Sequence, residues 1–138
     1  MEPIRVPRLV MPEDMNHHGT LYAGRLAEWF VEACYICAAR SAGLPGTMVC
    51  LKIHDLVYKI PVREGEILTL EARAVKAGQT SLTIYGKMVT GDGSLIQAEG
   101  FITFVCVDER NRPVAHGLRL PPARDAEDEG VRRRALHL

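Results

Sequence analysis

A single apolar segment, from Tyr22 to about Ser41, limits the folds open to this chain more than any other feature of the sequence. It contains no proline, and its glycine lies near the start, at Gly24. Ala, Leu, Trp, Phe, Val, Cys and Ile would occupy nearly every face of the helix that this segment predicts. A helix that is apolar on most sides has to be buried, so the rest of the chain is expected to wrap around it.

A narrow polar stripe interrupts this apolar surface. Arg25, Glu28 and Glu32 recur at helical spacing, so their side chains share one side of the helix. That side is therefore expected to meet something polar. The end of the helix is predicted by three residues that favour helix termination, Gly43, Pro45 and Gly46.

Five runs rich in β-branched residues predict strands, one before the helix and four after it. The predicted strands are Ile4 to Val10, Met48 to Tyr58, Glu66 to Ala77, Ser81 to Thr90 and Leu95 to Val107. Short turns at Ala77-Gly78-Gln79 and Thr90-Gly-Asp-Gly93 favour hairpins. The expected result is an α+β architecture, a mainly antiparallel sheet around one long helix.

Length and charge exclude several classes of protein. The 138 residues suffice for one domain with its own core. Lys plus Arg balance Asp plus Glu, 17 against 17, so no broad basic surface predicts binding to nucleic acid or to an anionic membrane. Neither a membrane span nor a secretory signal is predicted, and the cytoplasm is the expected location.

We expect one domain over residues 1–120 and a charged tail over residues 121–138. The tail is short of core residues and is interpreted as a mobile tail or a short surface helix. Its arginines, Arg132 to Arg134, are interpreted as a solvated run rather than a phosphate clamp.

The cysteines are interpreted as reduced side chains that pack in the core. They are Cys34, Cys37, Cys50 and Cys106. The first two form a C-x-x-C pattern, but they fall inside the apolar helix, and no second Cys or His pair stands at ligand spacing. The sequence therefore predicts no metal site, and no metal or redox cofactor is expected.

The polar, glycine-containing loop that leads into the helix is the strongest candidate for a functional site. The first amides of a helix have no partner within it and lie at the positive end of its dipole. They can stabilise an oxygen on which negative charge develops during a reaction. Ala23 and Gly24 stand at this helix start, and Glu28 and Glu32 follow one and two turns later. Hydrolysis needs this combination of donors and acid.

Three motifs resemble those of the hotdog-fold acyl-CoA thioesterases, especially the short bacterial acyl-CoA hydrolases and the mammalian cytosolic acyl-CoA hydrolase. They are Met11-Pro-x-Asp14-x-Asn16-x-x-Gly19-x-Leu21-Tyr22-Ala23-Gly24, Tyr58-x-x-Pro61-Val62-x-x-Gly65-Glu66 and Gly78-Gln79-Thr80-Ser81. The motifs occur in the family's order. The resemblance implies the hotdog fold, in which a curved, mainly antiparallel sheet of five or six strands wraps a long central helix.

The resemblance also implies roles for residues around the helix start. In that family a backbone N–H at this position, here Ala23 or Gly24, holds the thioester carbonyl oxygen, and a carboxylate about two turns later attacks the carbonyl or activates water. Asn16 resembles the residue that positions the water or the carbonyl, usually from the neighbouring subunit. At least a homodimer is therefore implied, with tetramers and hexamers as larger alternatives.

The chain departs from the family at the position of the acid, because Val31 stands there. Glu32 is the next residue and is rotated by about 100° around the helix, whereas Glu28 lies one turn earlier on nearly the same face. The side chain of Glu28 would point in the same direction as the family acid, but it starts one helical turn too early. Glu32 lies at almost the same position along the helix axis as the family acid, but its side chain points in a different direction. We slightly favour Glu32, because a small local adjustment of the helix would re-aim it.

Five further residues are candidate substrate contacts. His17 and His18 lie in the loop before the helix, where either can act as a base or hydrogen-bond the substrate. Coenzyme A carries phosphates, so cations and free backbone donors are expected at the mouth of the site. The resemblance places such donors in the turn that contains Gly78, Thr80 and Ser81.

The leading hypothesis is hydrolysis of an acyl-CoA thioester to a free acid and coenzyme A, which is then part of the substrate and not a cofactor. A second hypothesis is a protein that binds acyl-CoA without cleaving it, because Val31 replaces the acid. A third is hydration or dehydration of an acyl thioester, in which His17 or His18 would act with Glu28.

Overall fold

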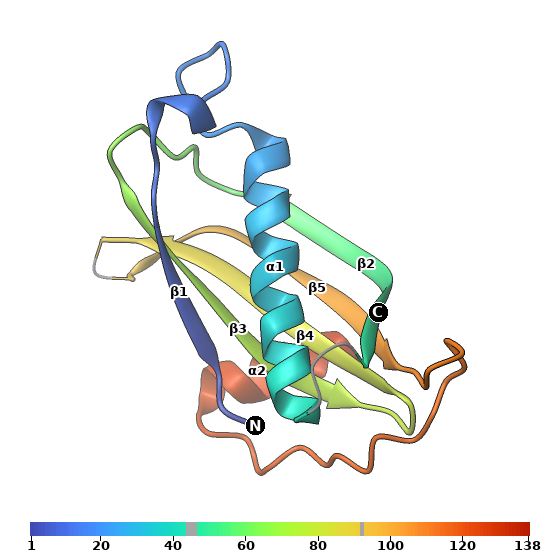
Figure 1. Cartoon of the computed structure of the whole chain (residues 1–138). Helices are drawn as coiled ribbons and strands as arrows, with labels where there is room; N and C mark the ends of the chain where they lie inside the picture. Colours follow the sequence, from blue (N-terminus) through green and yellow to red (C-terminus); the bar gives the residue numbers. More distant parts are fainter. Residues whose placement is uncertain (44–46, 92) are drawn as a thin grey trace.

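Helix α1 (Ala23–Ala42) lies along the concave face of a five-stranded antiparallel sheet in the computed structural model of the chain (Figure 1). The structure describes residues 1–43, 47–91 and 93–138. The other elements are β1 (Ile4–Leu9), the one-turn 3-10 helix η1 (Pro12–Asp14), β2 (Met48–Tyr58), β3 (Ile67–Ala77), β4 (Ser81–Thr90), β5 (Leu95–Cys106) and α2 (Ala126–Ala135). Three residues that the sequence analysis assigned to the helix end or to a turn lie outside the described residues, namely Pro45, Gly46 and Asp92.

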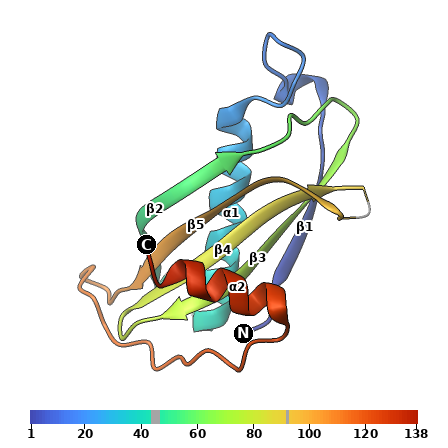
Figure 2. The ribbon, with the colours of Figure 1, turned by 180° about the vertical axis from the view of Figure 1, so that it is seen from behind.

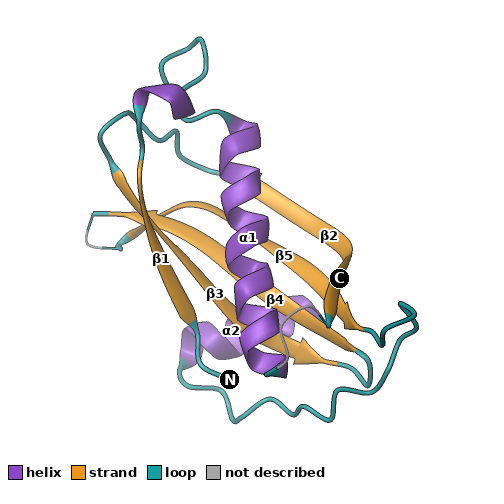
Figure 3. Ribbon diagram, viewed as in Figure 1, coloured by secondary structure: helices purple, strands orange, loops and turns teal. Residues whose placement is uncertain are grey.

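The strands follow the order β1-β3-β4-β5-β2, and every neighbouring pair is antiparallel. Consecutive strands β3, β4 and β5 lie side by side, as the predicted hairpins require (Figure 3). The predicted hotdog architecture, a long helix wrapped by a curved antiparallel sheet, is confirmed. Neither helix in the described part of the chain has the length and apolar character needed to cross a membrane.

Two glycines determine how α1 is seated and where it ends. A Cβ on Gly86 of β4 would lie 2.7 Å from Cε2 of Phe30 and 2.8 Å from Sγ of Cys34. Without that Cβ, α1 packs directly on the backbone of the sheet. At the other end, Gly43 has φ 73° and its N–H donates to the carbonyl of Ala39 (3.0 Å). Glycine adopts this left-handed cap without strain, and the prediction that Gly43 ends the helix is confirmed.

Helix α2 covers the opposite face of the sheet from α1 (Figure 2). Val131 and Ala135 of α2 are buried in a second apolar cluster with Val75, Tyr85 and Phe101 of the sheet. The segment 121–138, which the sequence predicts to be short of core residues, thus contributes Val131 and Ala135 to this cluster. Of the two alternatives for this segment, the structure contains the helix, and the division of the chain at residue 120 stays a prediction.

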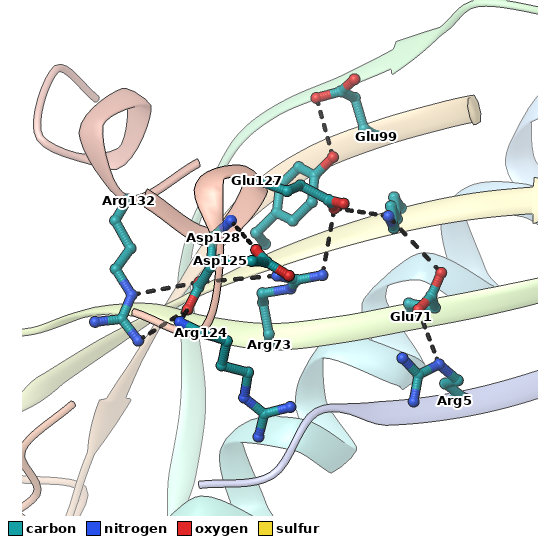
Figure 4. Close-up of polar contacts among 11 residues, drawn as sticks. Arg5, Glu71, Arg73, Glu99, Arg124, Asp125, Glu127, Asp128 and Arg132 are labelled. Carbon is teal, nitrogen blue, oxygen red and sulfur yellow. Dashed lines mark hydrogen bonds and ion pairs between the residues drawn. The ribbon is translucent and has the colours of Figure 1, made fainter. Parts of the chain in front are cut away.

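Ion pairs attach α2 to the sheet (Figure 4). Glu127 of α2 lies 2.7 Å from Nζ of Lys87 and 3.3 Å from Nη2 of Arg73. Asp128 is buried, and its Oδ2 lies 3.2 Å from Nη2 of Arg132, one turn further along α2. The interpretation of residues 132–134 as a solvated run was wrong for Arg132, because a buried carboxylate fixes this guanidinium.

Glu99 of β5 is a buried carboxylate with two cationic partners. Its side chain is 5% exposed, with Nζ of Lys59 at 2.8 Å and Nη2 of Arg134 at 2.7 Å. Arg134 of α2 is thus also paired. Burial by itself would raise the pKa of Glu99, but the hydrogen bonds from Lys59 and Arg134 outweigh it and hold that pKa below its ordinary value.

Replacing Glu99 by Gln tests how much this contact stabilises the fold. The variant loses two charge-assisted hydrogen bonds while the cations stay partly solvated, so we expect the free energy of unfolding to fall by about 2 kcal/mol at neutral pH. Because folding lowers the pKa of Glu99, its stabilisation is complete above the ordinary pKa of 4.5 and is lost as the pH falls through the folded-state pKa. Urea unfolding across this range should show the two proteins converging below pH 4.5.

Glu129→Gln is the matched control, because Glu129 lies on the exposed side of α2. Its free energy of unfolding should stay within about 0.5 kcal/mol of the wild-type value. Equal losses in the two variants, or a loss in Glu99→Gln that does not change with pH, would contradict the role given to Glu99.

Candidate active site

The first turn of α1 presents two backbone amides without a partner. The N–H groups of Arg25 and Leu26 donate to the carbonyl of Tyr22, at 3.0 and 3.1 Å. For the N–H groups of Ala23 and Gly24, the described parts of the chain provide no hydrogen-bond acceptor. Both amides stand at the positive end of the helix dipole. These two free N–H groups are the ones that the sequence predicts to stabilise the developing oxyanion.

Two tyrosines frame this helix start, and the sequence analysis gave neither of them a role. A Cβ on Gly24 would lie 2.5 Å from Cε2 of Tyr22, so the Tyr22 ring rests against the backbone of Gly24. Tyr22 is still 56% exposed. From the end of β2, the hydroxyl of Tyr58 donates to the carbonyl of Ala23 (2.8 Å). The sequence feature that could have indicated a role for Tyr22 is its position, directly before the first residue of the helix.

A pocket of about 620 Å³ lies between α1 and the edge strand β2, and its walls are mostly apolar. Its lining residues are Gly24, Ala27, Glu28, Val31, Glu32, Tyr35, Cys50 and Phe104. Val31, at the position of the family acid, belongs to this wall. Both glutamates that could replace the acid line the same pocket, and Gly24 lines it as well.

Glu28 is the less tightly held of the two glutamates. Its side chain is 70% exposed, and its Oε2 lies 3.5 Å from Nη1 of Arg25. Nε of Arg25 is in turn 3.2 Å from Oδ1 of the buried Asp14, so this guanidinium is shared between two carboxylates. The carboxylate of Glu28 is therefore held by one long ion pair and is largely exposed at the pocket.

Glu32 is bound to strand β1. The guanidinium of Arg8 donates a hydrogen bond to the carboxylate of Glu32. The same guanidinium lies over the ring of Trp29, 5.3 Å from its centroid, where a cation is attracted to the aromatic face. Arg8 thereby holds the carboxylate of Glu32 on the side of α1 that faces β1. The geometry favours Glu28, whereas the sequence analysis slightly favoured Glu32.

Asn16 shapes the loop before the helix with its own side chain. Its Oδ1 accepts hydrogen bonds from the N–H of His18 (2.8 Å) and of Thr20 (3.1 Å), and its Nδ2 donates to Oγ1 of Thr20 (3.0 Å). His17 and His18 are exposed, with ring centroids 3.9 Å apart. None of Asn16, His17 and His18 lines the pocket of its own chain.

The turn Gly78–Ser81 lies at the opposite end of α1 from the free amides, as Figures 1 and 2 show. Helix α1 has 20 residues and therefore spans about 30 Å. Within one chain, this turn cannot reach a group held at the helix start. The structure brings together Ala23, Gly24, Glu28 and Glu32, but it leaves Gly78, Thr80 and Ser81 at a distance.

Three of the four cysteines pack in the core, as expected, and Cys50 does not. Cys34, Cys37 and Cys106 are buried, and burial raises the pKa of the Cys34 thiol and that of the Cys37 thiol, the latter to about 11. Cys50 is exposed on β2 because the edge of the sheet leaves that residue uncovered. Among the described residues, no group of three His, Cys, Asp or Glu side chains is placed to hold a metal ion.

In sequence, the chain matches a known family over more than half of its length. The profile of the Thioesterase superfamily matches residues 18–97. An uncharacterised acyl-CoA thioester hydrolase of Zymomonas mobilis is 33% identical over 109 residues, which cover 76% of this chain and 72% of that protein.

In fold, the chain is similar to solved thioesterases. The acyl-CoA hydrolase of Staphylococcus aureus, solved with butyryl coenzyme A, coenzyme A and coenzyme A disulfide, has a TM-score of 0.87 at 25% identity, over 98% of this chain and 80% of that one. A hexameric thioesterase of Yersinia pestis has a TM-score of 0.72 at 27% identity, over 80% of this chain and 91% of that one.

The contact between Tyr22 and Gly24 predicts a particular double-mutant result. In the wild-type background, Gly24→Ala pushes a Cβ into the Tyr22 ring, so the free energy of unfolding should stay level or fall. In a Tyr22→Ala background, the same substitution should raise it by about 0.5–1 kcal/mol, because Ala loses less backbone entropy than Gly in a helix. Urea unfolding measures all four proteins, and an equal gain in both backgrounds would show that the ring does not rest on Gly24.

Proposed function

This chain belongs to the thioesterase superfamily, and from that premise we propose that it hydrolyses an acyl-CoA thioester to a free acid and coenzyme A. The observation that carries this proposal is the pair of unpartnered amides at Ala23 and Gly24, because Gly24 also lines an apolar pocket that contains the carboxylate of Glu28 one turn away. A thioester needs those features, because its carbonyl oxygen gains negative charge as water attacks.

In the proposed mechanism the carbonyl oxygen of the thioester accepts hydrogen bonds from the N–H groups of Ala23 and Gly24. Glu28 takes a proton from a water molecule, whose oxygen bonds to the carbonyl carbon. The carbon–sulfur bond then breaks, and the proton returns to the thiolate of coenzyme A. One oxyanion donor contributes about 10²–10³-fold to such a reaction, and a positioned base contributes about 10²–10⁴-fold.

The acyl chain would lie in the pocket between α1 and β2. Its volume of about 620 Å³ suits a small-molecule ligand. Val31, Tyr35 and Phe104 supply apolar wall beyond the donor pair. A valine at the position of the family acid adds apolar surface there, so the pocket favours an uncharged acyl group.

We also propose that the active unit is at least a homodimer. The edge strand β2 exposes Val49, Leu51 and Ile53, and an unpaired edge with apolar side chains favours pairing with another strand. A two-fold axis perpendicular to β2 would make the two α1 helices antiparallel. That arrangement would bring the Gly78–Ser81 turn of one copy toward the free amides of the other. We propose that Asn16 contributes to the site of the partner copy. The hexameric thioesterase of Yersinia pestis is a relative in fold that assembles.

Binding of acyl-CoA without cleavage is the second candidate function, and Val31 is the observation that favours it. The hydratase alternative needs a histidine beside the acid, but neither His17 nor His18 lines the pocket with Glu28 in its own chain. We keep a cytoplasmic location, no nucleic-acid partner and no resident cofactor as proposals, supported by the balanced charge and the free cysteines.

The purified protein should release thiol from at least one member of a panel of acyl-CoAs with short, medium, long and aromatic acyl groups. Release is measured with a thiol-reactive dye, and isothermal calorimetry measures binding of the same compounds. Tight binding of an acyl-CoA, with no thiol release from any member of the panel, would show that the protein binds acyl-CoA without cleaving it. Loss of enoyl absorbance with the thioester intact would establish a hydratase.

Substitution of the two pocket glutamates separates their roles. Glu28→Gln should lower kcat by at least about 100-fold with little change in KM, because it removes a base and keeps the shape of the side chain. Glu32→Gln is the matched control and should lower kcat by less than about tenfold, because Glu32 is held by Arg8. The reverse order would assign the reaction to Glu32.

A further inference from the structure

His116 connects the turn Gly78–Ser81 to the segment between β5 and α2. Its ring Nε2 lies 2.8 Å from the carbonyl oxygen of Ser81, a residue 35 positions earlier in the chain. Its backbone N–H donates to the carbonyl of Gln79 (3.2 Å). One residue thus holds the turn by both its side chain and its backbone, and the sequence analysis did not single it out.

The hydrogen bonds also determine which ring nitrogen carries the proton. Nδ1 of His116 accepts from the N–H of Leu118 (2.9 Å), so Nδ1 is unprotonated. The proton of the neutral ring is therefore on Nε2, which donates to the carbonyl of Ser81. Leu118 packs against the core, and the ring is braced between that backbone and the turn.

Three carbonyl groups of the turn, those of Gln79, Thr80 and Ser81, accept hydrogen bonds from within the protein. The carbonyl of Thr80 accepts from the N–H of Cys106 (2.7 Å), and that of Ser81 accepts from the N–H of Gly78 (2.9 Å) as well as from His116. For the N–H groups of Gln79 and Thr80, by contrast, the described residues contain no acceptor. Two adjacent free amides held in one conformation are suited to bind an anion.

We propose that His116 is a positioning residue, which holds the Gly78–Ser81 turn in the conformation that binds the phosphates of the coenzyme A substrate. This inference rests on the proposed function, because it takes acyl-CoA as the ligand. His116 itself does not touch the reacting atoms. It holds the carbonyl groups of Gln79 and Ser81 toward the protein. The N–H groups of Gln79 and Thr80 are then free for a ligand, and the turn does not have to change conformation when phosphate binds.

The test compares acyl-CoA with the matching acyl-pantetheine, which carries the same thioester but no phosphate. His116→Ala should raise KM for acyl-CoA about tenfold with kcat unchanged, because it weakens binding at a point remote from the thioester. For acyl-pantetheine, kcat and KM should stay within about twofold of wild type. A variant that had merely lost structure would be impaired on both substrates.

Two further variants control the experiment. His116→Gln places an amide donor near the position of Nε2 and should restore most of the affinity for acyl-CoA. His116→Asn is shorter, does not reach the carbonyl of Ser81 and should behave like His116→Ala. Unchanged KM for acyl-CoA in His116→Ala, equal losses on both substrates, or no rescue by Gln would each overturn the proposal.

Failure of the proposed function would be visible in the wild-type protein. If it cleaves neither thioester, hydrolysis is refuted, and calorimetry with coenzyme A and with pantetheine then decides the role of His116. Binding of coenzyme A should be weakened about tenfold in His116→Ala and recovered in His116→Gln. Equal affinities for coenzyme A in wild type and His116→Ala would overturn the inference about this residue.

Discussion

The contact of α1 with the sheet at Gly86 determines where every other part of the site lies. Phe30 and Cys34 approach the backbone of β4 so closely that no side chain fits between them and Gly86. Gly86 is paired across the sheet with Gly100, in the interior of β4 and β5. Because a helix is rigid, fixing α1 at this point also fixes both of its ends. The free amides then lie at one end of the sheet and the Gly78–Ser81 turn at the other.

The fold was predictable because its signals are local. Strands Met48–Tyr58 and Ser81–Thr90 have the predicted bounds, and α1 begins and ends within one residue of its prediction, since alternation, helical apolar character and turn residues are properties of short segments. Helix α2 gave no comparable signal. Val131 and Ala135 are two apolar residues in a charged segment. They are buried against Tyr85 and Phe101, which are distant in sequence.

The candidate site was predictable only in part, for the same reason. The loop and helix start are continuous in sequence, so Ala23 and Gly24 could be singled out together. The sequence slightly favoured Glu32 over Glu28, because it does not reveal the pairing of Glu32 with Arg8 of β1, which joins residues 24 positions apart. His116 carries no motif at all. Its proposed role depends on a contact between the segment after β5 and a turn 35 residues earlier in the chain, which the sequence does not reveal.

The two faces of the sheet use different interactions, and this separates stability from catalysis. On the concave face, apolar contacts seat α1 and leave an open pocket at the β2 edge. On the other face, α2 is attached by two buried carboxylates, Glu99 of β5, which pairs with Arg134 of α2, and Asp128 of α2, which pairs with Arg73 of β3. Changes that weaken the ionic face would lower stability through α2 without touching the pocket. In the proposed dimer, by contrast, each site takes its amides from one chain and its phosphate-binding turn from the other. Loss of the β2 interface would then abolish activity even though each chain remained folded.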